Sequence, residues 1–543
     1  MAFYSILFPS GEEEARARNH PWMTLRADHA REEKYTTYGN KTVLAQKNDA
    51  EEAVMRPGLY LDLNLDQIMD AVLCHETDHN LTELFYQFCP DGATVTYRQE
   101  VMRALEEPQV RGAFQAFLRS MVKAGRLLDY GATAHHAAQR DKYALDGAVL
   151  YCDAVRLLLD ETSALPIKSQ GLQCFLAAVR AYAGEERFGL LAHQTRQAQM
   201  ALEQISYALR VNDGVLHVDF EADAFDYAQA LRQDFDTKER WGTEADEGLF
   251  DILPFRQVEL SPLETLIMQA LMRRYPQAFG DARLAAEKCG VFPELFIARF
   301  TKELRFYLLY LDLMDQLRKN GLAFAYPAIA GDDGISITNA YDLALAIQTK
   351  AIVPNDFVLS KEERGAVITG ANQGGKTTFA RAIGQVAVLT ALGLPVPCER
   401  AALPLYSAVF SQFTMAEDST VDNGKLKEEL LRLRPILRGA GNGSLVILNE
   451  LFSSATASDA LDMAERALSL MLEAGAQVIC VTHINGIAVK HTVSMVAQVQ
   501  KENGRRLYKV MRAEADGQAY AGEIARRHHL TFHEIKERIT HGV

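Results

Sequence analysis

The sequence predicts a multidomain protein in which a mainly α-helical N-terminal region is followed by an α/β domain. From residue 58 to about residue 325, apolar residues recur every three or four positions, for example over 65–73 and 293–317, which is the period of an amphipathic helix. From about residue 331, short apolar runs bounded by turn residues alternate with helical segments, as in the βαβ units of a parallel sheet. The length of 543 residues also exceeds what a single hydrophobic core supports.

The predicted domains follow these changes of pattern. We expect an N-terminal segment over residues 1–57, a helical region over 58–330, an α/β domain over 331–518 and a C-terminal helical segment over 519–543. No run of residues approaches the length of about 18 apolar residues that a membrane-spanning helix needs. The seven cysteines are dispersed without a Cys-x-x-Cys pair, which is typical of reduced thiols. We therefore expect a cytoplasmic protein with no membrane partner.

The charge of the chain is unevenly distributed. The formal net charge is −14, and the acidic excess lies in the first 340 residues, whereas the remainder is close to neutral. Aspartate and glutamate are frequent between residues 213 and 251, which we interpret as a solvated loop or face. Proteins that bind nucleic acid usually present a basic face, so the composition alone does not predict a nucleic-acid partner.

A phosphate-binding loop is predicted at the start of the α/β domain, where the sequence fits G-x-x-x-x-G-K-[ST]. The motif follows a predicted strand over 366–369 and precedes an apolar helix, which is the context that it requires. Backbone N–H groups of such a loop and the N-terminus of the following helix hold nucleotide phosphates. The predicted phosphate-binding residues are Gly370, Ala371, Asn372, Gln373, Gly374, Gly375, Lys376, Thr377 and Thr378.

Residues after the neighbouring predicted strands complete the candidate site. The strand over 444–448 ends at Asn449 and Glu450, and the strand over 477–481 is followed by His483. Lys376 is expected to contact the β- and γ-phosphates, Glu450 to act as general base and His483 to sense the γ-phosphate. Thr377, Asn449 and Glu450 are the predicted ligands of Mg²⁺. Asn449 stands where aspartate is usual, so that position contributes no charge.

These elements, in this order, resemble the ATPase domain of the MutS family. Residues 367–378 are similar to the family's T-G-P-N-M-G-G-K-S-T, with Ala371 and Gln373 in place of proline and methionine. Residues 448–459 are similar to D-E-I-G-R-G-T-S-T-x-D. Residues 519–525 resemble the S-Y-G-x-x-V-A run that leads into the family's dimerising helices.

The resemblance implies an ABC-type P-loop ATPase that uses ATP and Mg²⁺ and acts as a homodimer. In this family each nucleotide is completed by a signature segment of the partner subunit, to which residues 418–430 are similar. Asn423, Gly424 and Lys425 would form this signature, with Gly424 in place of the family's serine. The helical region over 58–330 stands where the family has its core and lever helices.

The resemblance is incomplete where the family recognises mismatched DNA. The first hundred residues contain no Phe-x-Glu motif of the mismatch-reading kind, and only about 60 residues precede the core-like region. The interval 213–251, where a DNA-gripping clamp would be inserted, is acidic and would repel a duplex. We therefore do not expect mismatch recognition.

The leading hypothesis is a MutS-like, ATP-dependent DNA-binding protein. It would be a dimeric ATPase in which ATP binding gates two helical arms around a nucleic-acid partner, with DNA favoured over RNA. Two alternatives stay open. One is an ATPase that acts on RNA, a ribosome or a protein, which the acidic helical region favours. The other is a nucleotide-gated switch or scaffold that hydrolyses slowly, which Asn449 and Gly424 favour.

Overall fold

A computed structural model describes most of the chain. The acidic interval lies outside the described residues beyond residue 220, and so does the predicted C-terminal segment 519–543 apart from residues 535–536. The described residues are 3–18, 30–31, 36–38, 41–43, 56–74, 79–213, 215–220, 260–288, 293–331, 334–413, 425–484, 486–500, 506–514 and 535–536.

The chain divides into two compact units, each described here by itself. The first unit comprises Met1–Pro9, His75–Thr77 and Glu100–Leu308 and is mainly helical; the second comprises Ser10–Cys74, Asp78–Gln99 and Leu309–Val543. The chain is therefore multidomain, with helices and mixed α/β sheets, as the sequence predicts. The predicted boundaries at residues 57, 330 and 518 stay predictions.

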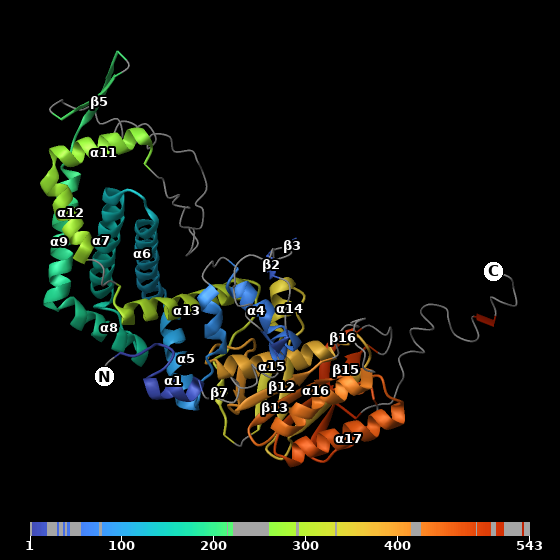
Figure 1. Cartoon of the computed structure of the whole chain (residues 1–543). Helices are drawn as coiled ribbons and strands as arrows, with labels where there is room; N and C mark the ends of the chain where they lie inside the picture. Colours follow the sequence, from blue (N-terminus) through green and yellow to red (C-terminus); the bar gives the residue numbers. More distant parts are fainter. Residues whose placement is uncertain are drawn as a thin grey trace. The chain divides into compact units, whose positions relative to one another are not determined.

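The first unit is built around an antiparallel pair of long helices, α6 and α7 (Figure 1). Helix α12 packs on α7 and on α9. Buried phenylalanine rings fill the base of this unit, where Phe175 of α8 stacks on Phe300 of α13 and both contact Phe117 of α6. Its helices are α6 (Pro108–Thr133), α7 (Ala137–Thr162), α8 (Gln170–Ala183), α9 (Glu186–Glu203), α11 (Pro262–Arg274) and α12 (Pro276–Lys288), and it shares α5 (Gly92–Glu106) and α13 (Leu295–Lys319) with the second unit.

A two-stranded hairpin projects from this unit beyond α11 (Figure 1). It consists of β5 (Ala208–Asn212) and β6 (Val215–Asp219), which are antiparallel. Helix α11 begins with a capping box, in which the Ser261 hydroxyl accepts from the N–H of Glu264 and the Glu264 carboxylate accepts from the N–H of Ser261.

The second unit contains a six-stranded sheet with the order β12-β13-β14-β10-β15-β16. The first five strands are parallel, and only β16 is antiparallel to its neighbour β15. The strands are β10 (Gly365–Gly370), β12 (Ala408–Gln412), β13 (Ser444–Asn449), β14 (Gln477–Val481), β15 (Thr492–Val499) and β16 (Arg506–Arg512). The helices that cover this sheet are α15 (Lys376–Ala391), α16 (Lys425–Gly439) and α17 (Ala457–Glu473).

A smaller, four-stranded sheet has the order β7-β11-β8-β9. Its strands are β7 (Ala328–Ile329), β8 (Ile335–Ala340), β9 (Asn355–Leu359) and β11 (Arg400–Leu403). The remaining elements of the second unit are α1 (Gly11–Arg18), α3 (Gly58–Asp62), α4 (Leu65–Val72), the 3₁₀ helix η1 (His79–Tyr86), α14 (Leu343–Gln348) and two short strand pairs, β1 (Ala30–Arg31) with β4 (Arg56–Pro57) and β2 (Thr36–Tyr38) with β3 (Lys41–Val43).

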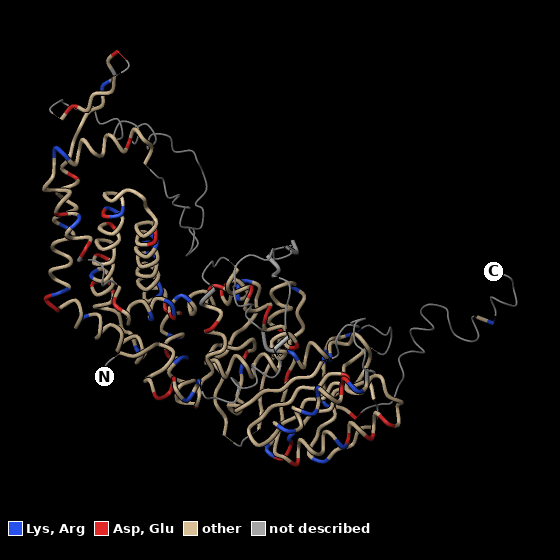
Figure 2. The backbone as a smooth tube through the Cα atoms, in the orientation of Figure 1, with Lys and Arg blue, Asp and Glu red and all other residues tan. Residues whose placement is uncertain are grey.

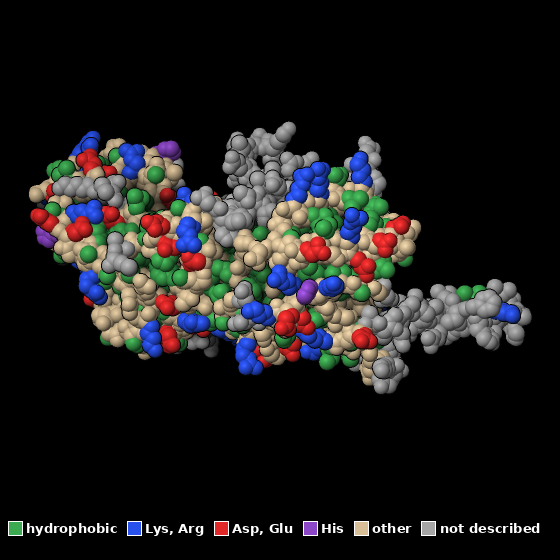
Figure 3. Space-filling view, turned by 90° about the horizontal axis from the view of Figure 1, so that it is seen from below, with side chains coloured by type: hydrophobic (Ala, Val, Ile, Leu, Met, Phe, Trp, Pro, Cys, Tyr) green, Lys and Arg blue, Asp and Glu red, His purple; other side chains and the backbone are tan. Residues whose placement is uncertain are grey.

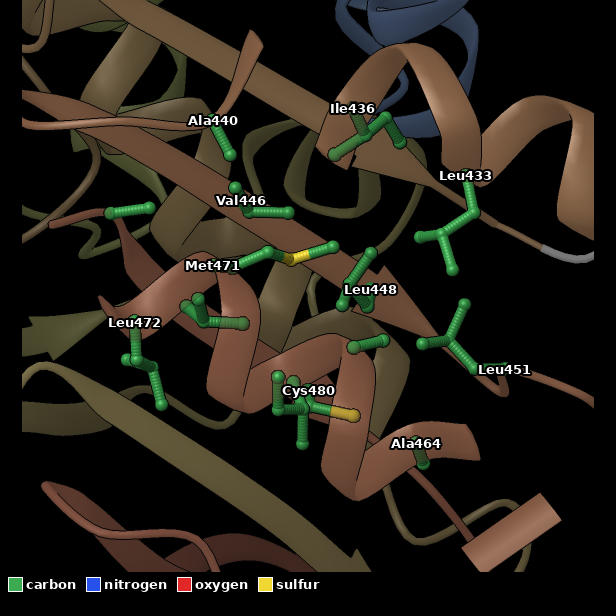
Figure 4. Packing of buried hydrophobic residues seen from close by; sticks show 14 of the residues in the cluster. Leu433, Ile436, Ala440, Val446, Leu448, Leu451, Ala464, Met471, Leu472 and Cys480 are labelled. Atoms are coloured by element: carbon green, nitrogen blue, oxygen red, sulfur yellow. The ribbon is translucent and has the colours of Figure 1, made fainter. Parts of the chain in front are cut away.

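The two faces of the six-stranded sheet are covered by different helices. On one face, Val446 and Leu448 of β13 belong to a buried cluster with α16 and α17, where Leu448, Leu451 and Leu433 lie close together (Figure 4). Ile447 points to the other face, where its side chain lies close to Gly384 of α15. Alternate residues of one strand thus serve the two cores, as expected for a sheet that is buried on both faces.

Buried hydrogen bonds join α15 to residues 62–63 and 342–343, which precede it in the sequence. Gln385, fully buried, donates from Nε2 to the Leu63 carbonyl at 2.9 Å and to Oδ1 of Asp342 at 2.8 Å. Its Oε1 accepts from the N–H of Leu343 at 2.7 Å. Arg381, one turn from the start of α15, donates to the Asp62 carbonyl at 2.8 Å. Because buried amides need all their partners, these bonds fix the register of α15.

The described surface carries charges of both signs. Basic and acidic residues follow one another along the same helices (Figure 2), and their side chains are interspersed on the face seen in Figure 3. None of the helices that the structure describes combines the length and the apolar character of a membrane span.

Replacing Leu448 with alanine is expected to destabilise the unit that contains the six-stranded sheet. Leu448 is fully buried in the cluster beneath α16 and α17, where large-to-small substitutions cost about 2–5 kcal/mol. Thermal unfolding followed by circular dichroism measures this as a lower midpoint. Leu470→Ala is the control, because Leu470 on α17 is 52% exposed and its loss changes stability by less than about 0.5 kcal/mol. Equal midpoints for the two variants would contradict this packing.

Candidate nucleotide-binding site

Three neighbouring strands bring the predicted site residues to one edge of the sheet. β14 lies between β10 and β13, and all three are parallel. Val481 of β14 pairs with Ile368 on one side and with Asn449 on the other, so the carboxyl ends of the strands lie level. The loops that follow the three strands therefore begin at the same edge, which is where ligands bind in open α/β sheets.

The loop between β10 and α15 has a backbone conformation that depends on glycine. Gly370 has a φ of 117° and Gly375 a φ of 90°, which lie in the region that residues with a Cβ atom rarely adopt. A Cβ atom at Gly374 would lie only 2.8 Å from the carbonyl oxygen of Ala371. Asn372 and Gln373 are exposed at the tip of the loop. The loop thus returns the chain directly into the N-terminus of α15, whose first N–H groups have no partner within the helix.

Lys376 is the first residue of α15, and its ammonium group lies inside this loop. Nζ donates to the carbonyl oxygens of Gly370 at 2.8 Å and Ala371 at 3.1 Å. Burial lowers the pKa of Lys376, and the carboxylate of Glu450 opposes that shift. Among the described residues, no carboxylate is bonded to this ammonium group, so an anion that binds beside it would stabilise its charged form.

The first turn of α15 also contacts the end of β13. The Thr377 hydroxyl donates to Oδ1 of Asn449 at 3.0 Å, and Asn449 is buried at the end of its strand. Thr378 is half-buried in the same turn. The hydroxyl and amide oxygens therefore lie together between the loop and the strand end, as the predicted metal site requires.

Glu450 leaves the strand in a strained conformation. Its φ is 57°, and its N–H donates to the carbonyl of Val481 at 2.8 Å. Phe452 has the same φ of 57°, while Leu451 and Phe452 are buried in the cluster with α16 and α17. A non-glycine residue in this region costs free energy and persists only where its surroundings hold it. The buried neighbours hold the turn that carries Glu450.

The structure describes His483 but only one of the three predicted signature residues. His483 follows β14 at the same edge, and its side chain is exposed. Asn423 and Gly424 lie outside the described residues, whereas Lys425 is the first residue of α16. The roles predicted for these four residues stay predictions.

The oxygen donors fit Mg²⁺ better than a softer metal. Among the described residues, no group of three or more histidine, cysteine, aspartate or glutamate side chains could hold a metal ion. The hydroxyl of Thr377, the amide of Asn449 and the carboxylate of Glu450 offer oxygen only. Mg²⁺ keeps several waters and uses one or two carboxylates together with phosphate oxygens, which matches this set.

Strand β16 adds two contacts to the loop that sequence reasoning missed. Arg506 donates from Nε to the Asn372 carbonyl at 2.8 Å. Tyr508, 50% exposed and with a φ of 55°, lies beside Gly375, where a Cβ atom would be 3.5 Å from its ring. An aromatic ring at the mouth of a phosphate loop can stack on a planar base.

Asn355 holds β16 in place. It accepts from the N–H of Val510 at 2.8 Å and donates to the Tyr508 carbonyl at 3.1 Å. Residues 353–356 resemble the Asn-containing segment that precedes the phosphate loop in the MutS family, but this resemblance does not predict a contact with β16. The pairing depends on a strand more than 150 residues later, so only the fold reveals it.

Parts of this chain are similar to a family model and to several known proteins. Residues 366–530, less than a third of the chain, match the family model described as MutS domain V. The DNA mismatch repair protein MutS of Thermotoga maritima is 26% identical over 40% of this chain and 28% of its own length. The protein of the same name from Natronomonas pharaonis is 34% identical over 28% of this chain and 18% of its own length.

A third relative is the DNA mismatch repair protein MutS 2 of Halobacterium salinarum, 29% identical over 36% of this chain and 24% of its own length. The chain thus matches between 18% and 28% of the length of these three relatives. The match to the family model covers the part of the chain that contains the phosphate loop, Asn449, Glu450 and His483.

Asn449→Asp is expected to lower the Mg²⁺ concentration needed for binding of a nucleoside triphosphate. Aspartate keeps an oxygen for the Thr377 hydroxyl and adds a negative charge, so we expect a shift of about tenfold. Titration of Mg²⁺ against a fluorescent nucleotide measures the midpoint. Asn449→Leu, which has a similar size but no oxygen, is expected to shift the midpoint the other way. The same midpoint in all three proteins would show that residue 449 does not contribute to cation binding.

Proposed function

We propose, from the premise that this chain belongs to the MutS family through its domain V, that it is an ATPase that binds DNA. ATP binding would bring two copies together and gate their helical arms around the nucleic acid. The observation that carries this proposal is the convergence of the glycine-dependent loop, the Thr377–Asn449 pair and Glu450 at one edge of the sheet.

The phosphates of ATP would be held by the loop over 370–376 and by the N-terminus of α15. Lys376, whose ammonium lies inside the loop, would bind phosphate oxygens. Thr377, Asn449 and Glu450 would hold Mg²⁺, which neutralises phosphate charge and orients the leaving group when it is bound. Tyr508 would lie against the base.

Glu450 would act as general base for the attacking water. The strained turn and the hydrogen bond from the backbone N–H of Glu450 to the Val481 carbonyl fix the position of the Glu450 backbone. Proton transfer requires a base that is held in position. General acid–base catalysis contributes roughly 10²–10⁴ in rate. His483, exposed at the same edge, would contact the γ-phosphate.

Slow hydrolysis is a second candidate, and Asn449 favours it. An amide at this position removes one negative charge from the proposed metal site, and Gly424 removes the serine hydroxyl that the family's signature carries. The protein would then act as a nucleotide-gated switch or scaffold in which binding, not turnover, sets the conformation.

At the projecting hairpin, basic side chains outnumber acidic ones, which supports a nucleic-acid contact there although residues farther along the interval 213–251 are acidic. A cavity of about 430 Å³ beside β5 and β6 is lined by Arg210, His217 and Arg274 against the single acid Asp219. Arg210 pairs with Asp219 at 3.3 Å, and the Arg274 guanidinium lies 5.6 Å from the centre of the Tyr275 ring. Basic groups beside aromatic rings suit phosphates and bases. DNA is favoured because the matched relatives are named as DNA mismatch repair proteins.

A role other than mismatch recognition is part of the proposal. It rests on the lack of a Phe-x-Glu motif among residues 1–100 of this sequence. RNA, a ribosome or a protein is the alternative partner, which the acidic excess of the first 340 residues favours.

Glu450→Ala is expected to bind ATP with nearly unchanged affinity and to release phosphate at least about 100-fold more slowly than the unaltered protein, because it lacks the proposed base. Phosphate release with saturating ATP and Mg²⁺ measures the rate, and light scattering under the same conditions is expected to find a dimer. Lys376→Ala is the companion variant, for which nucleotide binding itself is expected to be lost.

The outcomes separate the candidates. Equal phosphate release by Glu450→Ala and the unaltered protein would favour the switch over the ATPase. A monomer at saturating ATP and Mg²⁺ would remove the gating of paired arms. Nucleotide binding that survives Lys376→Ala would contradict the proposed site altogether.

The Arg210→Ala, Arg274→Ala double variant is expected to bind duplex DNA more weakly and with a shallower salt dependence. Each lost phosphate contact removes about 0.9 from the slope of log affinity against log salt concentration. Fluorescence anisotropy across a salt series measures that slope for duplex, branched and single-stranded DNA and for RNA.

Arg283→Ala is the control for this experiment, because Arg283 pairs with Glu287 on α12 and does not line the cavity. Preference for RNA, or no affinity for any nucleic acid, would favour the alternative partners. An unchanged slope in the double variant would exclude the hairpin as the contact.

A further inference from the structure

We infer that Glu429 of α16 is a positioning residue for Glu450 and that it links the nucleotide site to the helix whose first residue belongs to the predicted signature. The inference rests on the proposed function and adds to it the element through which Glu450 is held. Helix α16 begins at Lys425, immediately after the predicted signature residues Asn423 and Gly424. Glu429 lies at the second turn of the same helix.

The link begins with a hydrogen bond between α16 and the turn after β13. The Ser453 hydroxyl donates to Oε1 of Glu429 at 3.1 Å. Ser453 lies three residues after Glu450, beyond the two buried residues Leu451 and Phe452. The bond therefore joins α16 to the far end of the turn that carries the proposed base.

Apolar packing reinforces this bond. Leu451 and Phe452 are each 2% exposed and share one cluster with Leu433 of α16, and Leu426 packs against the same cluster. Leu451 and Leu433 face each other in Figure 4. A movement of the first two turns of α16 would displace both ends of the turn, because the apolar and the polar contacts are made by the same helix.

The end of β12 completes the arrangement. Gln412, 7% exposed, donates from Nε2 to the backbone carbonyl of Glu429 at 3.2 Å. Because a carbonyl oxygen can only accept a hydrogen bond, the NH₂ group of the Gln412 amide, and not its oxygen, faces the Glu429 carbonyl. Gln412 is followed closely by the segment that leads to the predicted signature, so the strand and the helix on either side of that segment meet at Glu429.

Two buried acceptors of this group have no hydrogen-bond partner within the described part of the chain. They are Oε1 of Gln412 and Oε2 of Glu429. An acceptor that is buried without a donor destabilises a protein, so a purely structural link would be expected to satisfy both. Both atoms belong to the residues that join β12 and α16 to the turn after Glu450, where a change of hydrogen-bond partner would act on that turn.

The closest structural explanation is that Glu429 only anchors α16. Glu428 separates the two readings, because it lies beside Glu429 on the same helix and pairs with Arg432 at 2.6 Å. A role in helix stability is shared by both glutamates. Among the described residues, Glu429 is hydrogen-bonded to the turn that carries Glu450, whereas Glu428 is bonded to Arg432.

The test compares Glu429→Ala, Ser453→Ala, Glu429→Gln and the control Glu428→Ala in the full-length protein. We expect Glu429→Ala and Ser453→Ala to lower the single-turnover rate of ATP hydrolysis by about 10-fold to 100-fold, since small displacements of a catalytic group cost that much. The Kd for ATP and the unfolding midpoint are expected to stay close to those of the unaltered protein. Glu429→Gln retains Oε1 as an acceptor and is expected to recover most of the rate.

The double variant Glu429→Ala, Ser453→Ala adds a second readout. If the two residues act through one bond, the double variant is expected to be no slower than either single variant. If the loss of rate in the double variant equals the product of the two single losses, the link is overturned. The link is also overturned if both single variants hydrolyse ATP at the rate of the unaltered protein. A parallel loss of rate, Kd and stability in Glu428→Ala as well would assign Glu429 to helix stability alone.

The result that would contradict the proposed function differs from the result that would contradict the role of Glu429. Absence of phosphate release by the unaltered protein at saturating ATP and Mg²⁺ would remove the ATPase and with it the role of Glu429. Hydrolysis by the unaltered protein that the four variants leave unchanged would remove the role of Glu429 and keep the ATPase.

Discussion

The parallel register of β10, β14 and β13 is the constraint on which the candidate site depends. Val481 pairs with Ile368 and with Asn449, so the phosphate loop, the Asn449–Glu450 turn and His483 leave the sheet at one level. A shift of β13 by one residue against β14 would turn Val446 and Leu448 away from α16 and α17 and bring Ile447 to their face. The two cores therefore fix the register, and the register fixes the site.

The charge of the candidate site is the second constraint, because the proposed metal position has one fewer carboxylate than is usual for a phosphate-loop enzyme. Thr377 donates to a neutral amide at Asn449, and Glu450 is left as the carboxylate beside Lys376. Fewer negative charges weaken the hold on Mg²⁺ but leave the loop and Lys376 free to bind phosphates. The reduced negative charge would therefore favour nucleotide binding over rapid turnover. The proposed ATPase and the proposed switch would then share one architecture and differ only in the rate of hydrolysis.

The strands and loops of the site could be predicted from local patterns, whereas their long-range partners could not. The predicted strand over 477–481 coincides with β14, and those over 366–369 and 444–448 fall within β10 and β13. Buried strands produce continuous apolar runs that a single sequence reveals. Glu429 stands within the segment 418–430 that resembles the family's signature, but that resemblance does not predict its bond to Ser453. That bond and the contacts of Tyr508 and Asn355 depend on chain segments that meet only in the folded protein.

The two faces of the sheet differ in how they would respond to nucleotide. Helix α15 is held by directional bonds from Gln385 and Arg381, which tolerate little displacement. Helix α16 is held mainly by the apolar cluster around Leu433, where contacts have no preferred direction and a small shift keeps most of the buried area. Its polar attachments, at Glu429, are incompletely satisfied among the described residues. The helix that would bind the phosphates is thus held by directional bonds, whereas the helix that adjoins the predicted signature is held by contacts that tolerate a small shift.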